Sequence, residues 1–322
     1  MAHHSPITLI SPEDVVLACP LMLGYWPSSS VCAVFVDADQ RVVVIMRWDH
    51  DADVVPPPLH PLTTGDTRVD AVHLVVFPPT RDVDVAPWLQ AADGMVAAGI
   101  KPGHFVLAGQ SGEGIVWTHA LDPAEDPRVG VLRHEEVLSR SREWGLLLWE
   151  EDRDAYVGDV APRAEVAARV RTVLARTESV TEEQRDSAID DVRAALDRTD
   201  LSEEDIAMVG VALADVQVRD TVLWDVMQEA PTGWGATADR LAAIVAAMPE
   251  SHVPAPATLL AIVRWQMGDG SRAAAAAARA LACDPDYTLA VLVDRCLATG
   301  MHPSTWRAGL VTLSRSECRR AA

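Results

Sequence analysis

The sequence predicts an α+β chain in which an N-terminal α/β domain with a mixed sheet, residues 1–143, precedes an all-α domain, residues 161–322. Two patterns lead to this prediction. Short apolar, β-branched runs, which are typical of buried strands, occur only before about residue 130. Beyond that point, apolar residues recur at helical spacing. Residues 144–160, between the two patterns, are expected to be a linker.

The first predicted elements are a helix and a hairpin. Ser11-Pro12-Glu13-Asp14 is typical of a helix start, with a serine N-cap, proline at the first helical position and acids in the first turn. Pro20 is expected to shorten or kink this helix. Two apolar runs follow, Val31–Val36 and Arg41–Trp48, and the turn-like residues between them predict a hairpin.

The rest of the N-terminal half alternates between strand and helix signals. Val72–Phe77 is a continuous apolar run, as expected for a strand that is buried on both faces. Val85–Ile100 has helical spacing, and its predicted inward residues are Trp88, Leu89, Met95 and Val96. Two further strands are expected at Phe105–Ala108 and Ile115–Thr118, which would complete a mixed sheet with helices on its faces.

The second half is predicted to be helical throughout. The expected helices are Arg163–Arg176, Glu182–Asp197, Ser202–Met227, Ala236–Met248, Ala257–Met267, Ser271–Cys283 and Tyr287–Thr299. In the last three, Gly268-Asp269-Gly270 precedes an alanine-rich helix that ends at Asp284-Pro285, and small residues let neighbouring helices approach closely. This pattern is tetratricopeptide-like, but without a second clear copy an extended solenoid is not expected.

Composition narrows the class of protein. The 322 residues carry a formal charge of −20, with 9 basic and 20 acidic residues up to residue 150 and 18 and 27 after it. Both halves would repel phosphate backbones and anionic lipid, so neither a nucleic-acid nor a membrane partner is expected. The five cysteines form no Cys-x-x-Cys pair, and neither a secretory leader nor a membrane-spanning run is visible. A cytoplasmic location is therefore expected.

The pattern of the whole chain resembles a known family. The residues that carry the resemblance are LGYWPSSSV, the Val218-Arg219-Asp220 triplet, PAPATLLAIVRWQMGDG and ALACDPDYTLAVLVDRCLATGMHP. They resemble actinobacterial proteins grouped as domain of unknown function 4192, over roughly Ile7 to Pro303. The resemblance implies an actinobacterial source but no activity, substrate or cofactor. Many members carry a cysteine-rich stretch where this chain has residues 115–123 without cysteine, so it is expected to be a divergent member.

Three serines, Ser28, Ser29 and Ser30, stand directly before a predicted strand. A nucleophile elbow would need flanking glycines at a strand-to-helix turn, and a phosphate loop would need glycines and a following helix. Because neither pattern is present, a structural helix-to-strand connection is favoured over catalysis. GQSGEG, residues 109–114, fails the elbow pattern by one residue and is favoured as a hairpin turn.

Metal and acid–base chemistry have only weak candidates in the sequence. Asp49, Asp51 and Asp53 alternate as cation ligands can, but they lack the glycine and glutamate of a calcium loop, so an acidic solvated loop is favoured. His73 lies within an apolar strand and is interpreted as a hydrogen-bonded core residue. His119 and His134 fall near the join between the halves, where a cleft could use them. No metal and no cofactor are predicted.

These observations lead to two hypotheses. The first is a non-enzymatic protein-interaction or assembly protein that binds a protein partner or forms a homo-oligomer, with interface candidates Trp144, Trp149, Trp265 and Tyr287. The alternative is a small-molecule-binding protein or a hydrolase-type enzyme with its site in the interdomain cleft. The ligand-cleft candidates are Tyr25, Trp26, Ser28, Ser29, Ser30, His119 and His134.

Overall fold

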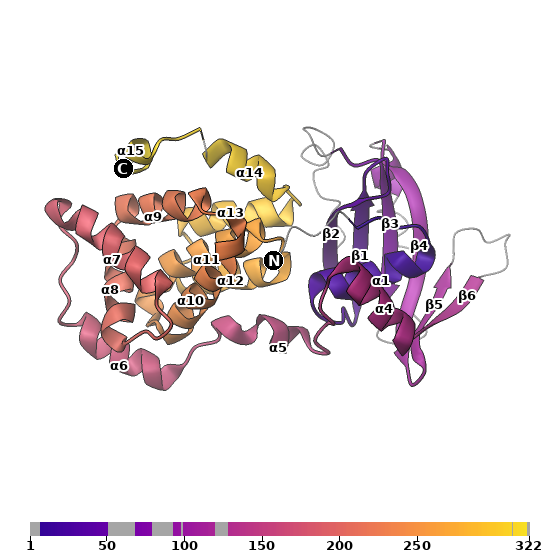
Figure 1. Cartoon of the computed structure of the whole chain (residues 1–322), viewed down its shortest axis with the longest axis horizontal. Helices are drawn as coiled ribbons and strands as arrows, with labels where there is room; N and C mark the ends of the chain where they lie inside the picture. The colour runs from indigo at the N-terminus through magenta and orange to yellow at the C-terminus, as the bar shows by residue number, and fades with distance from the viewer. Residues whose placement is uncertain are drawn as a thin grey trace. The chain divides into compact units, whose positions relative to one another are not determined.

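A computed structural model gives the structure of the chain and describes residues 7–50, 68–78, 93–97, 99–119, 128–310 and 312–320. The chain divides into a sheet unit, formed by the residues up to Tyr156 together with Thr299–His302, and a helical unit formed by Val157–Ala298 and the segment from Pro303 (Figure 1). The predicted fold class, an α+β chain with a mixed sheet followed by helices, is confirmed.

The sheet has six strands in the order β2-β1-β3-β4-β5-β6. Only β3 and β4 pair in parallel, and the other neighbours are antiparallel, which makes the sheet mixed. The hairpin predicted from the first two apolar runs is confirmed as the β1–β2 pair. The strands are β1 (Ser30–Val36), β2 (Val42–Asp49), β3 (Ala71–Phe77), β4 (Lys101–Ser111), β5 (Gly114–His119) and β6 (Arg128–Arg133).

Helix α1 (Pro12–Leu23) lies across one face of this sheet (Figure 1). It begins as predicted, because the Ser11 hydroxyl accepts from the amide of Asp14 and the Asp14 carboxylate accepts from the amide of Ser11. Pro20 does not end it. The helix continues three residues further and stops at Gly24, whose positive φ of 82° closes the C-terminus.

Residues on alternate positions of the strands face α1, and the residues between them form a second apolar layer on the opposite face. Met95, in the short helical stretch 93–97, belongs to that second layer as predicted. Val96 does not, because the next residue of a helix points about 100° further round and its side chain is exposed. Trp88 and Leu89 lie outside the described residues.

Two elements of the sheet unit were not predicted. Strand β6 pairs with β5, and helix α4 (His134–Trp144) follows it directly. The predicted linker, residues 144–160, also contains regular structure: α5 (Arg153–Val157) and a 3₁₀ turn at Gly158–Val160. Glu150 within it pairs with Tyr25, which follows the end of α1.

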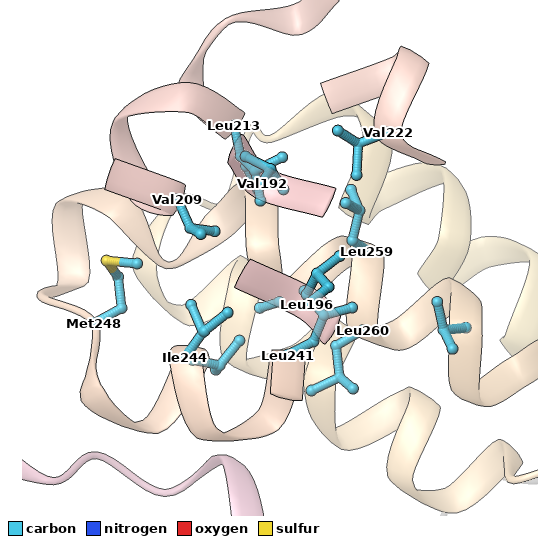
Figure 2. Packing of buried hydrophobic residues seen from close by; sticks show 14 of the residues in the cluster. Val192, Leu196, Val209, Leu213, Val222, Leu241, Ile244, Met248, Leu259 and Leu260 are labelled. Carbon is cyan, nitrogen blue, oxygen red and sulfur yellow. The ribbon is translucent and has the colours of Figure 1, made fainter. Parts of the chain in front are cut away.

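The helical unit packs around one apolar core (Figure 2). Val192 and Leu196, Val209 and Leu213, and Leu259 and Leu260 enter the core from three different helices. Its helices are α6 (Ala164–Leu174), α7 (Arg185–Asp197), α8 (Glu203–Ala214), α9 (Val216–Gln228), α10 (Trp234–Ala247), α11 (Pro254–Gln266), α12 (Gly270–Cys283), α13 (Thr288–Ala298), α14 (Pro303–Leu310) and α15 (Arg315–Cys318). No helix in the described part of the chain has the length and apolarity that crossing a membrane requires.

The prediction of a single helix for Ser202–Met227 is wrong, because the helix is interrupted at Asp215. This residue is extended, with φ −76° and ψ 118°, and its carboxylate accepts from the amides of Gln217 and Val218 at 2.9 and 3.1 Å. It also pairs with Arg185 of α7 at 2.9 Å. Asp215 therefore ends α8 and caps α9, although the apolar spacing continues across the break.

Asp215→Ala is expected to lower the free energy of unfolding of the helical unit by about 1–2 kcal/mol, because two amides at the start of α9 and Arg185 lose their acceptor. Urea titration followed by circular dichroism measures the change. Asp239→Ala, an exposed position within α10, is the matched control and should stay within about 0.5 kcal/mol of the parent. Equal losses in both variants would contradict the capping role.

Candidate functional site

The segment that follows α4 exposes two leucines on a backbone that is held at both ends. Gly145, with φ 66°, ends the helix. At the first anchor the Ser141 hydroxyl donates to the carbonyl oxygen of Leu146 at 2.7 Å, and the Leu146 amide donates to the carbonyl of Ser141 at 3.0 Å. The chain thus leaves α4 in one defined direction.

The second anchor lies four residues later, at Glu150. Its amide donates to the carbonyl of Gly24 at 2.9 Å, and its carbonyl accepts from the amide of Trp26 at 2.8 Å. These two bonds form a parallel bridge between Glu150 and Tyr25. The leucine segment, residues 146–149, is therefore fixed to α4 on one side and to the residues after α1 on the other.

Within the leucine segment, Leu147 is 88% exposed and Leu148 is 46% exposed. The predicted interface residues Trp144 and Trp149 flank them, and both are partly buried in the core of the sheet unit. The Arg140 guanidinium lies 5.6 Å from the centre of the Trp144 ring. Two large aliphatic side chains are therefore presented to solvent between two anchored tryptophans.

Tyr25 and Trp26, two of the predicted ligand-cleft residues, are packed close to the leucine segment. Trp26 is buried, with its ring centre 5.8 Å from that of Trp149 and 5.1 Å from that of Phe77, which it meets edge-on. Tyr25 is buried against Tyr156 at 5.7 Å. The structure thus brings ligand-cleft and interface candidates together as one aromatic cluster.

The three serines connect α1 to β1, as the structural interpretation predicted. The Ser30 hydroxyl is buried, donates to the carbonyl of Ser28 at 2.8 Å and accepts from Nε of Arg47 at 2.8 Å. Ser29 has a φ of 50°, and its carbonyl accepts from the amide of His50. These hydrogen bonds stabilise a turn. Ser28 is the exposed member of the three serines.

The structure does not bring His119 and His134 together. His119 pairs with Arg128 at one end of the β5–β6 hairpin, whereas His134 follows Arg133, which pairs with Gly114 at the other end. Five strand positions separate the two ends, or roughly 17 Å at strand rise. His134 is exposed at the start of α4.

His119 instead joins two other histidines on the face of the sheet that α1 covers. His104 Nδ1 lies 3.0 Å from His119 Nε2, and the ring centres are 5.0 Å apart. His73 stacks on His104 with the ring centres 5.2 Å apart. These three residues, from β3, β4 and β5, are called the histidine row below.

The remaining polar candidates have structural partners. GQSGEG forms the β4–β5 turn, in which Ser111 pairs with Gly114, so the predicted hairpin turn is confirmed. Asp49 pairs with Arg47 at 2.5 Å at the end of β2, and Asp51 and Asp53 lie outside the described residues. Among the residues that the structure describes, no group of three or more His, Cys, Asp or Glu side chains could hold a metal ion.

Trp265 and Tyr287 lie inside the helical unit. Trp265 is buried, with its ring centre 6.0 Å from that of Trp306, so it is not accessible to a partner in this structure. The Tyr287 hydroxyl accepts from Arg219 at 2.7 Å, and Arg219 also pairs with Asp220 at 2.7 Å. Burial raises the pKa of Tyr287. Two motifs that are 68 residues apart in the sequence thus meet in one contact.

Tyr287→Phe is expected to lower the free energy of unfolding by about 1.5 kcal/mol, because it leaves one donor of a largely buried guanidinium without its acceptor. Chemical denaturation with tryptophan fluorescence measures the loss. The control is Asp294→Ala on the exposed side of α13, with an expected change within about 0.5 kcal/mol. A loss no larger than the control's would mean that the contact contributes nothing.

Comparison with known proteins gives one match. The model of a family described as a domain of unknown function (DUF4192) matches residues 12–304, which is most of the chain and covers both units. No curated protein and no solved structure matches the chain significantly. The chain therefore belongs to the DUF4192 family.

Proposed function

We propose that this protein is a non-enzymatic protein-interaction or assembly protein, and that the leucine segment contacts a protein partner or a second copy of the chain. The exposure of Leu147 on a backbone held at Leu146 and Glu150 carries the proposal. Burying one such leucine contributes about 1.5–3 kcal/mol. Because the backbone is already fixed, association costs less conformational entropy than it would for a free loop.

The surroundings of the two leucines favour one kind of partner surface. Glu143, Glu150 and Glu151, which stand on either side of the two leucines in the sequence, are exposed, and Glu143 pairs with Arg140 at 2.8 Å. An apolar centre with a charged rim is the usual anatomy of a protein interface. The partner surface is expected to offer an apolar pocket edged by lysine or arginine. The net charge of −20 argues against nucleic acid or anionic lipid in the same role.

The helical unit supports the same role. The alanine-rich α12 buries Ala273, Ala276, Ala277 and Ala280 completely and packs against α11 and α13. We take these three helices as a tetratricopeptide-like element, a type that presents helical surfaces to protein partners. The family and the excess of arginine over lysine support an actinobacterial source, and the five free cysteines support a cytoplasmic location.

Native mass spectrometry of the protein, purified gently from its own cells, tests the proposal. We expect a mass above the 34.7 kDa of one chain, from a bound protein or a second copy. The double substitution Leu147→Glu and Leu148→Glu should return the mass to one chain while the unfolding midpoint stays unchanged, because both side chains are solvent-exposed.

The matched control is Leu292→Glu, a comparably exposed leucine on α13 of the helical unit, which should keep the larger mass. A single-chain mass for the parent protein would contradict the proposal. A larger mass that survives the double substitution would also contradict it, since the contact would then lie elsewhere. A bare chain that carries a small molecule would favour the ligand-binding alternative.

A further inference from the structure

Strand β6 leaves one edge of the sheet without a partner strand among the residues that the structure describes (Figure 1). The amide of Arg133 donates to the Glu136 carboxylate at 2.8 Å, so it points away from β5. A Cβ at Gly114 of β5 would lie 2.0 Å from the carbonyl oxygen of Leu132, so this oxygen points toward β5. Because the direction alternates from residue to residue in an antiparallel strand, the odd-numbered residues of β6 turn their amides and carbonyls outward.

Two valines occupy the middle of this edge. Val129 is 63% exposed and Val131 is 42% exposed. Their side chains lie on the face away from α1, because the neighbouring Leu132 points into the core that α1 covers. On the α1 face the Trp117 ring lies across the strand, and a Cβ at Gly130 would lie 2.5 Å from it.

The backbone groups of Val129 and Val131 have no hydrogen-bond partner within the described part of the chain. The edge therefore offers unpaired donors and acceptors beside an apolar strip. These are the two features by which a sheet edge binds an added strand: backbone bonds give affinity, and alternate side chains give specificity.

An arginine stands at each end of the strand. Arg128 and Arg133 are exposed, and neither guanidinium has an ion-pair partner among the described residues. The nearby Glu136 carboxylate accepts from the amide of Arg133 and not from its guanidinium. In a chain with a formal charge of −20, these two groups give the edge a local positive charge, which favours carboxylates on the added strand.

A second copy of β6 fits this edge less well than an acidic segment does. An antiparallel partner must present its own outward-facing residues, so Val129 of one copy would oppose Val131 of the other. In that register neither arginine comes opposite a carboxylate. The equal net charges of two copies also repel each other.

We propose that β6 binds an extended acidic segment of a partner protein as an added antiparallel strand with the pattern Glu-x-Val-x-Val-Glu. The two valines of the pattern would oppose Val131 and Val129 and form backbone bonds with them. The first glutamate would then oppose Arg133 on the same face, and the last would oppose Arg128 on the other. This surface is additional to the proposed contact of the leucine segment and does not depend on it.

Two fluorescently labelled peptides test this assignment by anisotropy. One is Ser-Gly-Glu-Thr-Val-Thr-Val-Glu-Gly-Ser, and the other has lysine in place of both glutamates. The glutamate peptide is expected to bind the full chain saturably, with a Kd on the order of 100 μM. The lysine peptide should bind about tenfold more weakly or not at all, because it meets two arginines.

Arg128→Glu with Arg133→Glu should reverse this order, so that the lysine peptide binds more tightly than the glutamate peptide. The matched control is Arg171→Glu with Arg295→Glu, at two exposed positions of the helical unit. This control makes the same change in net charge and should keep the order of the parent protein. A control that also reversed the order would mean that overall charge, and not β6, selects the peptide, which would contradict the proposal.

Val131→Pro removes an outward amide while leaving the bonds between β6 and β5 in place, and it should weaken binding of the glutamate peptide about tenfold. Val131→Thr keeps the amide and the β-branched shape, so its Kd should stay within about twofold of the parent value. If Val131→Pro fails to fold, the charge reversal decides the question by itself.

Leu147→Glu with Leu148→Glu should leave the Kd of the glutamate peptide unchanged, so this test and that of the leucine segment can fail separately. Loss of binding in that variant would place the peptide on the leucine segment and overturn the proposal. No saturable binding, equal affinity of the parent protein for both peptides, or an unchanged Kd in folded Val131→Pro would each overturn it. A concentration-dependent dimer that excludes the peptide would do so too, because β6 would then pair with a second copy.

Discussion

Asp159→Ala is expected to destabilise the helical unit by about 3–5 kcal/mol, because it leaves the Arg264 guanidinium buried without its counter-charge. Arg264 lies on α11, and its side chain is only 3% exposed. It donates two parallel hydrogen bonds to Asp159, from Nη1 to Oδ1 at 3.2 Å and from Nη2 to Oδ2. A guanidinium cannot lose its proton at accessible pH, so the cation stays where it is.

Guanidinium chloride titration of Asp159→Ala, with α-helix content as the signal, measures this loss. Arg264→Met in the same chain should recover most of it, because the methionine fills the site without a charge. Glu203→Ala breaks an exposed ion pair with Arg169 and is the control, with an expected loss of no more than about 1 kcal/mol. If the single and double variants were equally unstable, the buried charge would not be the cause.

Two of the predicted strands are recognisable from complete burial. β1 and β3 are buried at every position, so their continuous apolar runs identified them. β6 is an edge strand, with Val129 and Val131 exposed and an arginine at either end, and its short alternation did not stand out. Helix α4 was missed for a similar reason, since only Val137 and Ser141 are buried among its eleven residues.

In the helical half, spacing located the helices but not all of their ends. Apolar residues continue in register through Asp215, so the pattern gave one long helix where two exist. The aspartate itself was the available signal, because aspartate is a typical N-cap residue whose side chain accepts from the first backbone amides of a helix. An apolar period records which residues are buried, whereas a cap depends on a single side chain.

The candidate sites depend on contacts that sequence spacing does not contain. Pairing between parallel strands brings His73 beside His104, and the register of that pairing cannot be deduced from either strand alone. For this reason the sequence did not identify His104 as a candidate. The exposure of Leu147 follows from backbone bonds between Glu150 and residues 24–26, more than a hundred positions away. The serine turn and the GQSGEG turn were local enough to be interpreted from their own residues.

The histidine row is expected to make the sheet unit lose stability in mild acid. Burial, reinforced by the neighbouring His104, lowers the pKa of His73 from 6.5 to about 4. The unfolded chain therefore takes up a proton as pH falls below about 6.5, while the folded chain does not until about pH 4. Stability from this group is complete above pH 6.5 and is lost between 6.5 and 4, by an amount on the order of 3 kcal/mol.

Urea titrations of the sheet unit's signal at a series of pH values between 7 and 4.5 measure this slope. His73→Phe should flatten most of it, since the variant has no proton to take up at this position, whereas His134→Phe should keep the parent slope. Parallel curves for the parent and His73→Phe would contradict the assignment.

The upper part of this window separates the histidines from the many carboxylates of the chain. Ordinary aspartates and glutamates titrate near pH 4, and those held in ion pairs titrate lower still, so they contribute little slope above about pH 5.5. Burial also lowers the pKa of His104, so any slope that survives in His73→Phe should have the same sign. A loss of stability that begins near pH 6.5 therefore reports imidazole that is buried in its neutral form.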